Sequence, residues 1–471
     1  MPINKISLAL CLAGFTVLSA QATTLQISSE QRESIDLTLY NQNLGLVRET
    51  RELPPLKTGQ SVTLEDVSKQ LQVESLRIDN AGKILEQNLN TNLLNQQNLL
   101  QHFVGKELKL ARLNPVSGKE IISSVKLLSI DGSRALIKRN NSFESIPLNN
   151  GWRFIFPNLP SQLLAKPSVS FRSSGTSKAQ LTGISYLTSG LSWDMDYVMT
   201  LNEAGTQVTL DGLASLTNNT GADFKDAQIS LVAGDLNNPG ARHATALQED
   251  FSNMVMARGA AAPKSLSGES IGDFHLFSLP RKVDLLNGQV KQVSFLTAEK
   301  VPVSRSYDYE FLVYPTLERN QHRVKPNLTL KFLNDQKSHL GMPLPAGKIR
   351  TFSPDSKGQL QFMGGSSINH TGEGDEVEVT QGKAFDLSIH RKQIHFSTVF
   401  NGFKVGQELR ITNSRSTPAD LVMTANFPLV WEMESSNIEF EKVLGGSAQW
   451  KIKVPAKGEK VLRFHVKMEK R

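Results

Sequence analysis

Asp194 and Asp196 are the residues of this chain whose type and spacing come closest to a catalytic pair. They stand two apart in a stretch where apolar residues recur at every second position, so a strand would carry both carboxylates on one face, about 7 Å apart. Carboxylates at such separations act as acid, base or nucleophile in glycoside hydrolysis. Trp193 would lie on the other face, either in the core or as a binding platform for a sugar ring. We favour the simpler interpretation, a strand with an aromatic core face and a solvated acidic face.

A second candidate is a group of basic residues near the C-terminus. Between alternating apolar positions stand Lys451 and Lys453 in one predicted strand, and Arg463, His465 and Lys467 in the next. The turn at residues 455–458 predicts a hairpin with one apolar and one basic face, and the basic face would attract phosphate or carboxylate groups. The alternative, which we favour, is that these side chains keep an edge strand from pairing with other sheets.

The sequence holds no motif for other familiar chemistries. His390 and His395 are five apart and have no carboxylate at a metal-ligand spacing. There is no Gly-x-Ser-x-Gly elbow, phosphate-binding loop or dinucleotide fingerprint. We therefore expect no metal and no cofactor, and a non-catalytic protein rather than an enzyme. Nucleic acid is not an expected partner, because no recognition motif accompanies the basic residues.

The N-terminus has the pattern of a secretory signal peptide. Lys5 precedes an apolar run at residues 6–20, and Ala20-Gln21-Ala22 predicts cleavage between Ala22 and Thr23. The run is shorter than the roughly 20 residues of a membrane-spanning helix, and no later stretch is long and apolar enough. The sequence thus predicts a periplasmic or secreted protein. Cys11, the one cysteine, lies in the leader, so the mature chain would have no disulfide.

The charge of the predicted mature chain is concentrated at one end. The 52 lysines and arginines fall to 51 without Lys5, and subtracting the 45 acidic residues leaves +6. Residues 441–471 hold nine basic and three acidic residues, also +6. The remainder sums to zero, which assigns the basicity to the C-terminal end.

The apolar pattern along the chain is that of strands. Apolar residues alternate with polar ones in many stretches, such as residues 328–332 and 421–427. Three similar stretches each end in an asparagine, at Asn218, Asn334 and Asn413, where the side chain can bond to its own backbone and so end a strand. We predict a mainly β fold of stacked, Ig-like β-sandwich domains with a small SH3-like barrel insert and one short helix.

The predicted domains follow from this pattern and the turns. Residues 1–22 are the leader, and residues 23–80 form an N-terminal β segment that pairs with the first sandwich. Residues 81–150 form the insert, with a helix at about 92–104 before four strands at 107–112, 121–130, 134–138 and 143–146. A central sandwich spans 160–320 and contains a long flexible loop at 236–273, and a C-terminal sandwich spans 321–471.

Several blocks resemble a bacterial exported family known only as a domain of unknown function. They are the run YLTSGLSWDMDY at 186–197, LTNNTG at 216–221, LVAGD at 231–235, the opening at 39–48, and residues 344–350 and 382–386. The related mucoidy-inhibitor-like proteins share the later blocks but add a coiled coil, and this chain has no sustained heptad run. The resemblance covers nearly the whole mature chain and implies an exported, β-rich architecture without an assigned activity.

Two functions remain open from the sequence. The first is an exported, envelope-associated binding or scaffold protein that contacts an anionic envelope polymer or another envelope protein through the basic C-terminal strands. The second is a carbohydrate-active hydrolase centred on Asp194 and Asp196.

Overall fold

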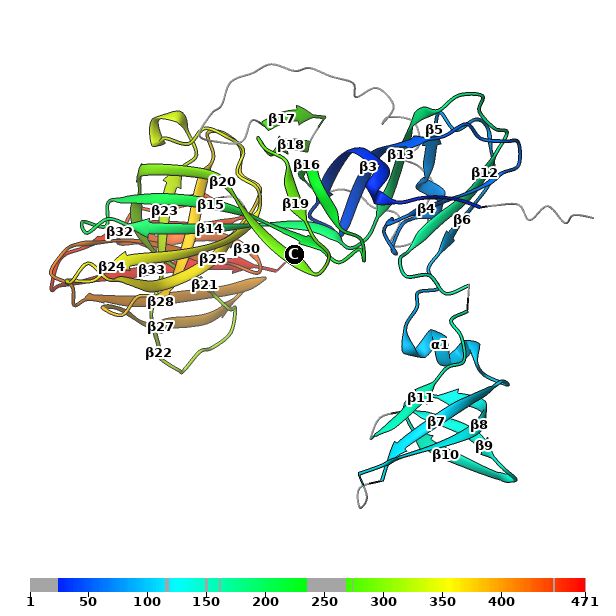
Figure 1. Cartoon of the computed structure of the whole chain (residues 1–471). Coiled ribbons are helices and arrows are strands. Elements are labelled where there is room, and N and C mark those ends of the chain that lie inside the picture. Colours follow the sequence, from blue (N-terminus) through cyan, green and yellow to red (C-terminus); the bar gives the residue numbers. More distant parts are fainter. Residues whose placement is uncertain are drawn as a thin grey trace, which may run out of the picture. The chain divides into compact units, whose positions relative to one another are not determined.

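The computed structural model describes residues 24–114, 118–148, 151–160, 162–234, 268–272, 274–443 and 445–470. Over these residues the fold is mainly β with one α-helix, which confirms the predicted fold class (Figure 1). None of the described helices is long and apolar enough to cross a membrane. The predicted leader, residues 1–22, and residues 236–267 of the predicted loop lie outside the described part of the chain.

The chain divides into two compact units. The first contains the described residues up to Ile35 together with Leu46–Ser189 and Thr220–Phe224; the second contains Asp36–Gly45, Gly190–Asn219 and Lys225–Arg471. The predicted domain boundaries stay predictions.

The first unit contains a sheet in which β4 and β12 are the inner strands. Its order is β1 (Leu25–Ile27), β4 (Ser61–Glu65), β12 (Ser168–Ser173) and β6 (Ile84–Asn90). Elsewhere in the unit, β13 (Gln180–Thr188) pairs with β5 (Arg77–Asp79) and lies next to β3 (Leu44–Leu53).

A buried ion pair joins β3 to the neighbouring layer of this unit. Arg51 is fully buried, and its guanidinium donates to Glu49 Oε1 at 2.7 Å and to the main-chain oxygens of Ile27 at 3.1 Å and Glu65 at 2.7 Å. Arg32 also pairs with Glu49. Since a buried charge is tolerated only when it is paired and hydrogen-bonded, we assign this network to structure rather than function.

Residues 107–155, most of which belong to the insert predicted at 81–150, form a five-stranded antiparallel sheet with its own core, whereas residues 84–90 of the predicted insert are β6 of the first sheet. The sheet order is β10 (Ser142–Pro147), β9 (Arg134–Arg139), β8 (Glu120–Asp131), β7 (Glu107–Leu113) and β11 (Trp152–Ile155). Strand β11 was not predicted. Because β10 and β11 remain edge strands among the described residues, the sheet is not closed into a barrel.

Helix α1 (Gln96–His102) packs on this sheet. Asn95 caps it by accepting a hydrogen bond from the Asn98 main chain at 2.8 Å, and Gly105 follows the helix with φ +83°. Leu99 and Leu100 enter the same cluster as Leu110 and Ile137.

The first sandwich of the second unit has a five-stranded layer. Its order is β20 (Gln289–Pro302), β15 (Gln207–Asn218), β14 (Leu191–Leu201), β24 (Gly347–Pro354) and β25 (Leu360–Ile368). A further layer contains β16 (Phe224–Ala233), which pairs with residues 36–40 of β2 (Arg32–Tyr40), with β18 (Phe274–Ser278) and with β19 (Val283–Leu285). Residues 268–271, placed in the predicted loop, instead form strand β17 (Gly268–Ile271) against β18.

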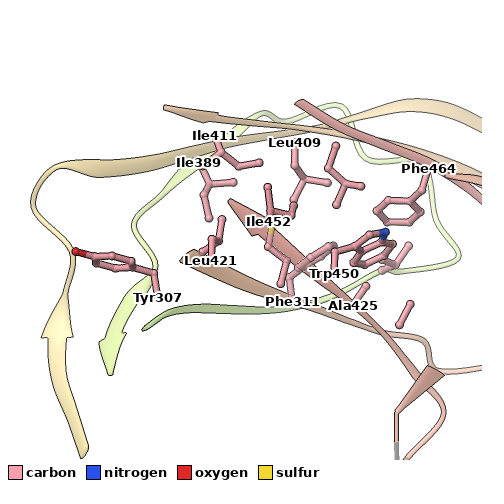
Figure 2. Packing of buried hydrophobic residues seen from close by; sticks show 14 of the residues in the cluster. Tyr307, Phe311, Ile389, Leu409, Ile411, Leu421, Ala425, Trp450, Ile452 and Phe464 are labelled. Atoms are coloured by element: carbon pink, nitrogen blue, oxygen red, sulfur yellow. The ribbon is translucent and has the colours of Figure 1, made fainter. Parts of the chain in front are cut away.

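The second sandwich of this unit consists of two sheets with a shared core. The first sheet has the order β26 (Glu376–Lys383), β23 (Asn327–Leu333), β21 (Ser304–Leu312), β29 (Ala419–Asn426), β32 (Ser447–Val454) and β31 (Glu441–Val443). The second has the order β22 (His322–Val324), β27 (Leu387–Val399), β28 (Gly402–Asn413), β33 (Glu459–Glu469) and β30 (Val430–Ser436). Figure 2 shows Leu409 and Phe464 of the second sheet meeting Ile452 and Trp450 of the first in the core.

Candidate functional site

Asp194 and Asp196 lie on β14 as expected, and their environments differ. Asp194 is exposed. Asp196 is partly buried and accepts hydrogen bonds from Ser215 Oγ at 2.8 Å and Arg350 Nη1 at 3.0 Å. Partial burial would raise the pKa of Asp196, but the two donors outweigh it and hold this pKa below its usual range. Asp194 is solvated, as the simpler interpretation predicts, whereas Asp196 is partly buried and paired with Arg350. The hydrolase hypothesis stays a prediction.

Trp193 is fully buried. Its Nε1 donates to the main-chain oxygen of Val232 at 3.1 Å, and its ring stacks on Phe295 with the centroids 6.4 Å apart. Because no ring face is open to solvent, the structure contradicts the suggestion that Trp193 is a platform for sugars. It serves the core of the first sandwich.

The basic C-terminal strands do not form the predicted hairpin. β32 pairs with β29 and β31, whereas β33 pairs with β28 and β30, so the chain crosses from one sheet of the sandwich to the other between them. Trp450 and Phe464 stack across the core with their centroids 4.9 Å apart. The physical reason is burial. Each of the two strands has an apolar face, and when the strands lie in opposing sheets these two faces pack against each other in the core.

The predicted basic surface is therefore divided between two outer faces. Lys451 and Lys453 point away from the core on β32, and Arg463, His465 and Lys467 do so on β33. The edge-strand alternative is wrong for His465 and Lys467, because β33 pairs with both β28 and β30 there. It stays open for Lys451 and Lys453, because β31 pairs only with residues 447–449 of β32, and the stretch that holds these lysines pairs with β29 alone.

Carboxylates neutralise most of these basic side chains. Lys451 pairs with Glu441 at 3.2 Å, and Lys467 pairs with Glu469 at 2.7 Å. Arg463 pairs with Glu408 at 2.6 Å. Three of the nine lysines and arginines of residues 441–471 are thus ion-paired, whereas Lys453 and Lys460 form no salt bridge among the described residues.

His465 takes part in a contact that sequence spacing does not reveal. Its ring faces that of His395 across Gly406, with the centroids 6.1 Å apart, and its Nδ1 lies 3.2 Å from Ser435 Oγ. A Cβ on Gly406 would lie 2.7 Å from the His465 ring, so the glycine gives the rings room. No group of three or more candidate metal ligands occurs in the described ranges, so this pair alone carries no assignment.

The insert carries a charge excess that the sequence interpretation missed. Residues 96–156 contain nine lysines and arginines and four acidic residues, a net charge of +5. Our sum over the whole remainder of the chain cancelled this excess against acidic segments elsewhere. A count over a window the size of one small domain would have found it.

Part of this excess lies on one side of the insert sheet. Leu108, Leu110, Val125 and Ile137 are buried, so the residues between them in the same strands point to the opposite side. We call this side the insert face, and define it by Lys109, Ile122, Lys126, Leu136, Lys138 and Phe143.

The lysines of the insert face have a carboxylate beside them but no ion pair with it: Glu107 stands directly opposite Lys126 on β7, and no salt bridge joins the two. Lys126 and Lys138 stand directly opposite each other on β8 and β9, where like charges repel. Lys138 stands opposite Phe143, with its Nζ 6.0 Å from the ring centroid. Within the part of the chain that the structure describes, neither these two lysines nor Lys109 forms a salt bridge. A bound anion would relieve the repulsion.

Apolar side chains lie among these lysines. Phe143 is 67% exposed, Ile122 53% and Leu136 39%. Single exposed apolar residues are ordinary, but three on one sheet face beside unpaired lysines are typical of an interaction surface.

The fold and these surfaces define a mainly β protein of sandwich units with a basic insert sheet. The chain belongs to the family described as Domain of unknown function (DUF4139), which matches residues 183–470. This confirms the resemblance to a domain of unknown function; the relation to mucoidy-inhibitor-like proteins stays a prediction. None of the curated proteins matches the chain. The matched region includes Asp194, Asp196 and the C-terminal strands, whereas the insert face lies outside it.

Proposed function

We propose that the protein is exported and acts as an envelope-associated binding or scaffold protein that contacts an anionic envelope component. The observation that carries the proposal is the insert face, where Lys109, Lys126 and Lys138 have no salt bridge among the described residues. Phosphate or carboxylate groups that bind these lysines would reduce the electrostatic repulsion between them, and no existing ion pair would have to break.

The contact is assigned to the insert rather than to the C-terminal strands. Cations such as Lys451 and Arg463 already have carboxylate partners, so an external anion would have to compete with Glu441 and Glu408. Separation of the C-terminal cations onto opposite faces also keeps them from acting on one ligand.

The predicted leader supports the location. Lys5, the apolar run and the cleavage pattern at Ala22 and Thr23 would bring the mature chain to the periplasm or the medium, where anionic envelope polymers and lipids are accessible.

The test is retention on isolated envelope material. We expect the purified mature chain to sediment with this material at low salt and to be released at high salt, because exposed charges are screened. Replacing Lys109, Lys126 and Lys138 together by Glu should abolish most of the retention.

A matched control changes the net charge equally at other exposed lysines. The variant in which Lys178, Lys225 and Lys357 are replaced by Glu should keep the retention of the unchanged protein, since these residues lie outside the insert face. Equal loss in both variants, or full retention of the insert variant, would refute the assignment.

A further inference from the structure

We infer that the insert face docks on a lipid bilayer that contains anionic headgroups. The inference rests on the proposed function, in which this face makes the envelope contact, and it names the chemistry of the partner.

The charge of the insert sets the first requirement. The insert as a whole has a net charge of +5, and its face carries three lysines without salt bridges among the described residues beside one carboxylate, Glu107, so an anionic partner suits it. A second copy of the chain would present the same positive face and be repelled. The density of anionic headgroups on a membrane surface matches lysines that lie side by side on β8 and β9.

The apolar residues set the second requirement. A hydrophilic polyanion would leave Phe143, Ile122 and Leu136 in water, whereas the boundary between headgroups and acyl chains can bury them. Lysine side chains suit this position, because their methylene stems can lie along apolar groups while the ammonium reaches the phosphates.

The core of the insert is already complete without these side chains. Leu110, Leu127 and Ile137 are fully buried beneath the sheet, together with Leu100 of α1. Phe143 lies on the edge strand β10, where the sheet leaves it open on one side. The exposed apolar residues of the insert face are therefore not needed to fill the core of the insert.

The experiment measures flotation of the full mature chain with vesicles. The probes are vesicles of phosphatidylcholine alone and vesicles that also contain phosphatidylglycerol. We expect binding to the second kind only. Replacing Lys109, Lys126 and Lys138 by Glu should lower the partition coefficient at least about tenfold, since each cation near an anionic surface contributes to it.

A second variant tests the apolar contribution at constant charge. Phe143→Ser should weaken binding severalfold, whereas Phe400→Ser, which changes a fully exposed phenylalanine elsewhere, should not. A Phe143→Ser variant that binds as well as the unchanged protein would overturn the inference.

The outcomes separate this inference from the proposed function. Retention on envelope material without binding to phosphatidylglycerol vesicles would refute a lipid partner, point to a soluble polyanion and leave the proposed function in place. Failure of the unchanged protein to sediment with envelope material would refute both.

Discussion

Glu408 illustrates how the sandwich neutralises its surface cations. Its side chain is 9% exposed and bonds to Arg463 at 2.6 Å and Lys392 at 2.9 Å. The hydrogen bond from Arg463, followed by that from Lys392, holds the pKa of Glu408 below its usual range. One carboxylate thus serves two cations, an arrangement that the lysines of the insert face lack.

This arrangement predicts a pH-dependent contribution to stability. Because the folded pKa of Glu408 is lowered, its contribution is fully present above the unfolded pKa, about 4.3, and is lost as the pH falls through the folded value. Glu408→Gln should therefore lower the free energy of unfolding at pH 7 by about 1–2 kcal/mol. Urea denaturation of both proteins should show this difference shrinking below about pH 4.

A matched control is Glu441→Gln. The pair of Glu441 with Lys451 is exposed, with side-chain exposures of 63% and 67%, so its loss should change stability by less than about 1 kcal/mol. A Glu408→Gln effect that is equally small, or independent of pH, would contradict the account.

At the scale of elements, the alternation of apolar residues predicted where strands lie in the sequence, but it did not predict which strands pair with each other. Strand β14, for example, carries Trp193, Met195 and Tyr197 on its buried face, as the pattern indicates. The same pattern in β32 and β33 is compatible with a hairpin and with two opposing sheets. Local periodicity does not decide between them, because the decision depends on what covers each apolar face.

The three asparagines at strand ends show which part of the structure could be predicted from short stretches of sequence. Asn218, Asn334 and Asn413 are all buried, and their amides donate to main-chain oxygens. Asn413, for instance, donates to Thr417 at 3.0 Å and Pro455 at 3.0 Å. The sequence predicted the strand ends, whereas the distant carbonyl partners follow only from the tertiary structure.

The opposing arrangement of β32 and β33 predicts an energetic coupling between their aromatic residues. Trp450→Leu and Phe464→Leu should each destabilise the fold, because both rings are fully buried. The double variant should lose less than the sum, by roughly 0.5–1.5 kcal/mol, as stacked aromatic pairs do. Denaturation of all four proteins gives this value, and strict additivity would speak against direct packing.

At the scale of the whole molecule, composition predicted the fold class and assigned the basicity to the C-terminal end, without the charge excess of the insert. The 4 short strands and the helix of the insert were predicted near their observed positions, whereas β11 was not. The basicity of residues 441–471 is real, but carboxylates such as Glu408 and Glu469 lie within bonding distance in the folded chain. Whether a cationic side chain forms an ion pair depends on its neighbours in the tertiary structure, and a count of charges along the sequence does not reveal them.

The central claim is that the insert face, and not the C-terminal strands, contacts the anionic envelope component. Lysine acetylation of the full mature chain, with and without envelope material and read by mass spectrometry, tests it within one sample. We predict that Lys109, Lys126 and Lys138 lose reactivity on binding, while Lys451 and Lys453 keep theirs. Protection of Lys451 and Lys453 with unchanged reactivity at the insert face would contradict the account.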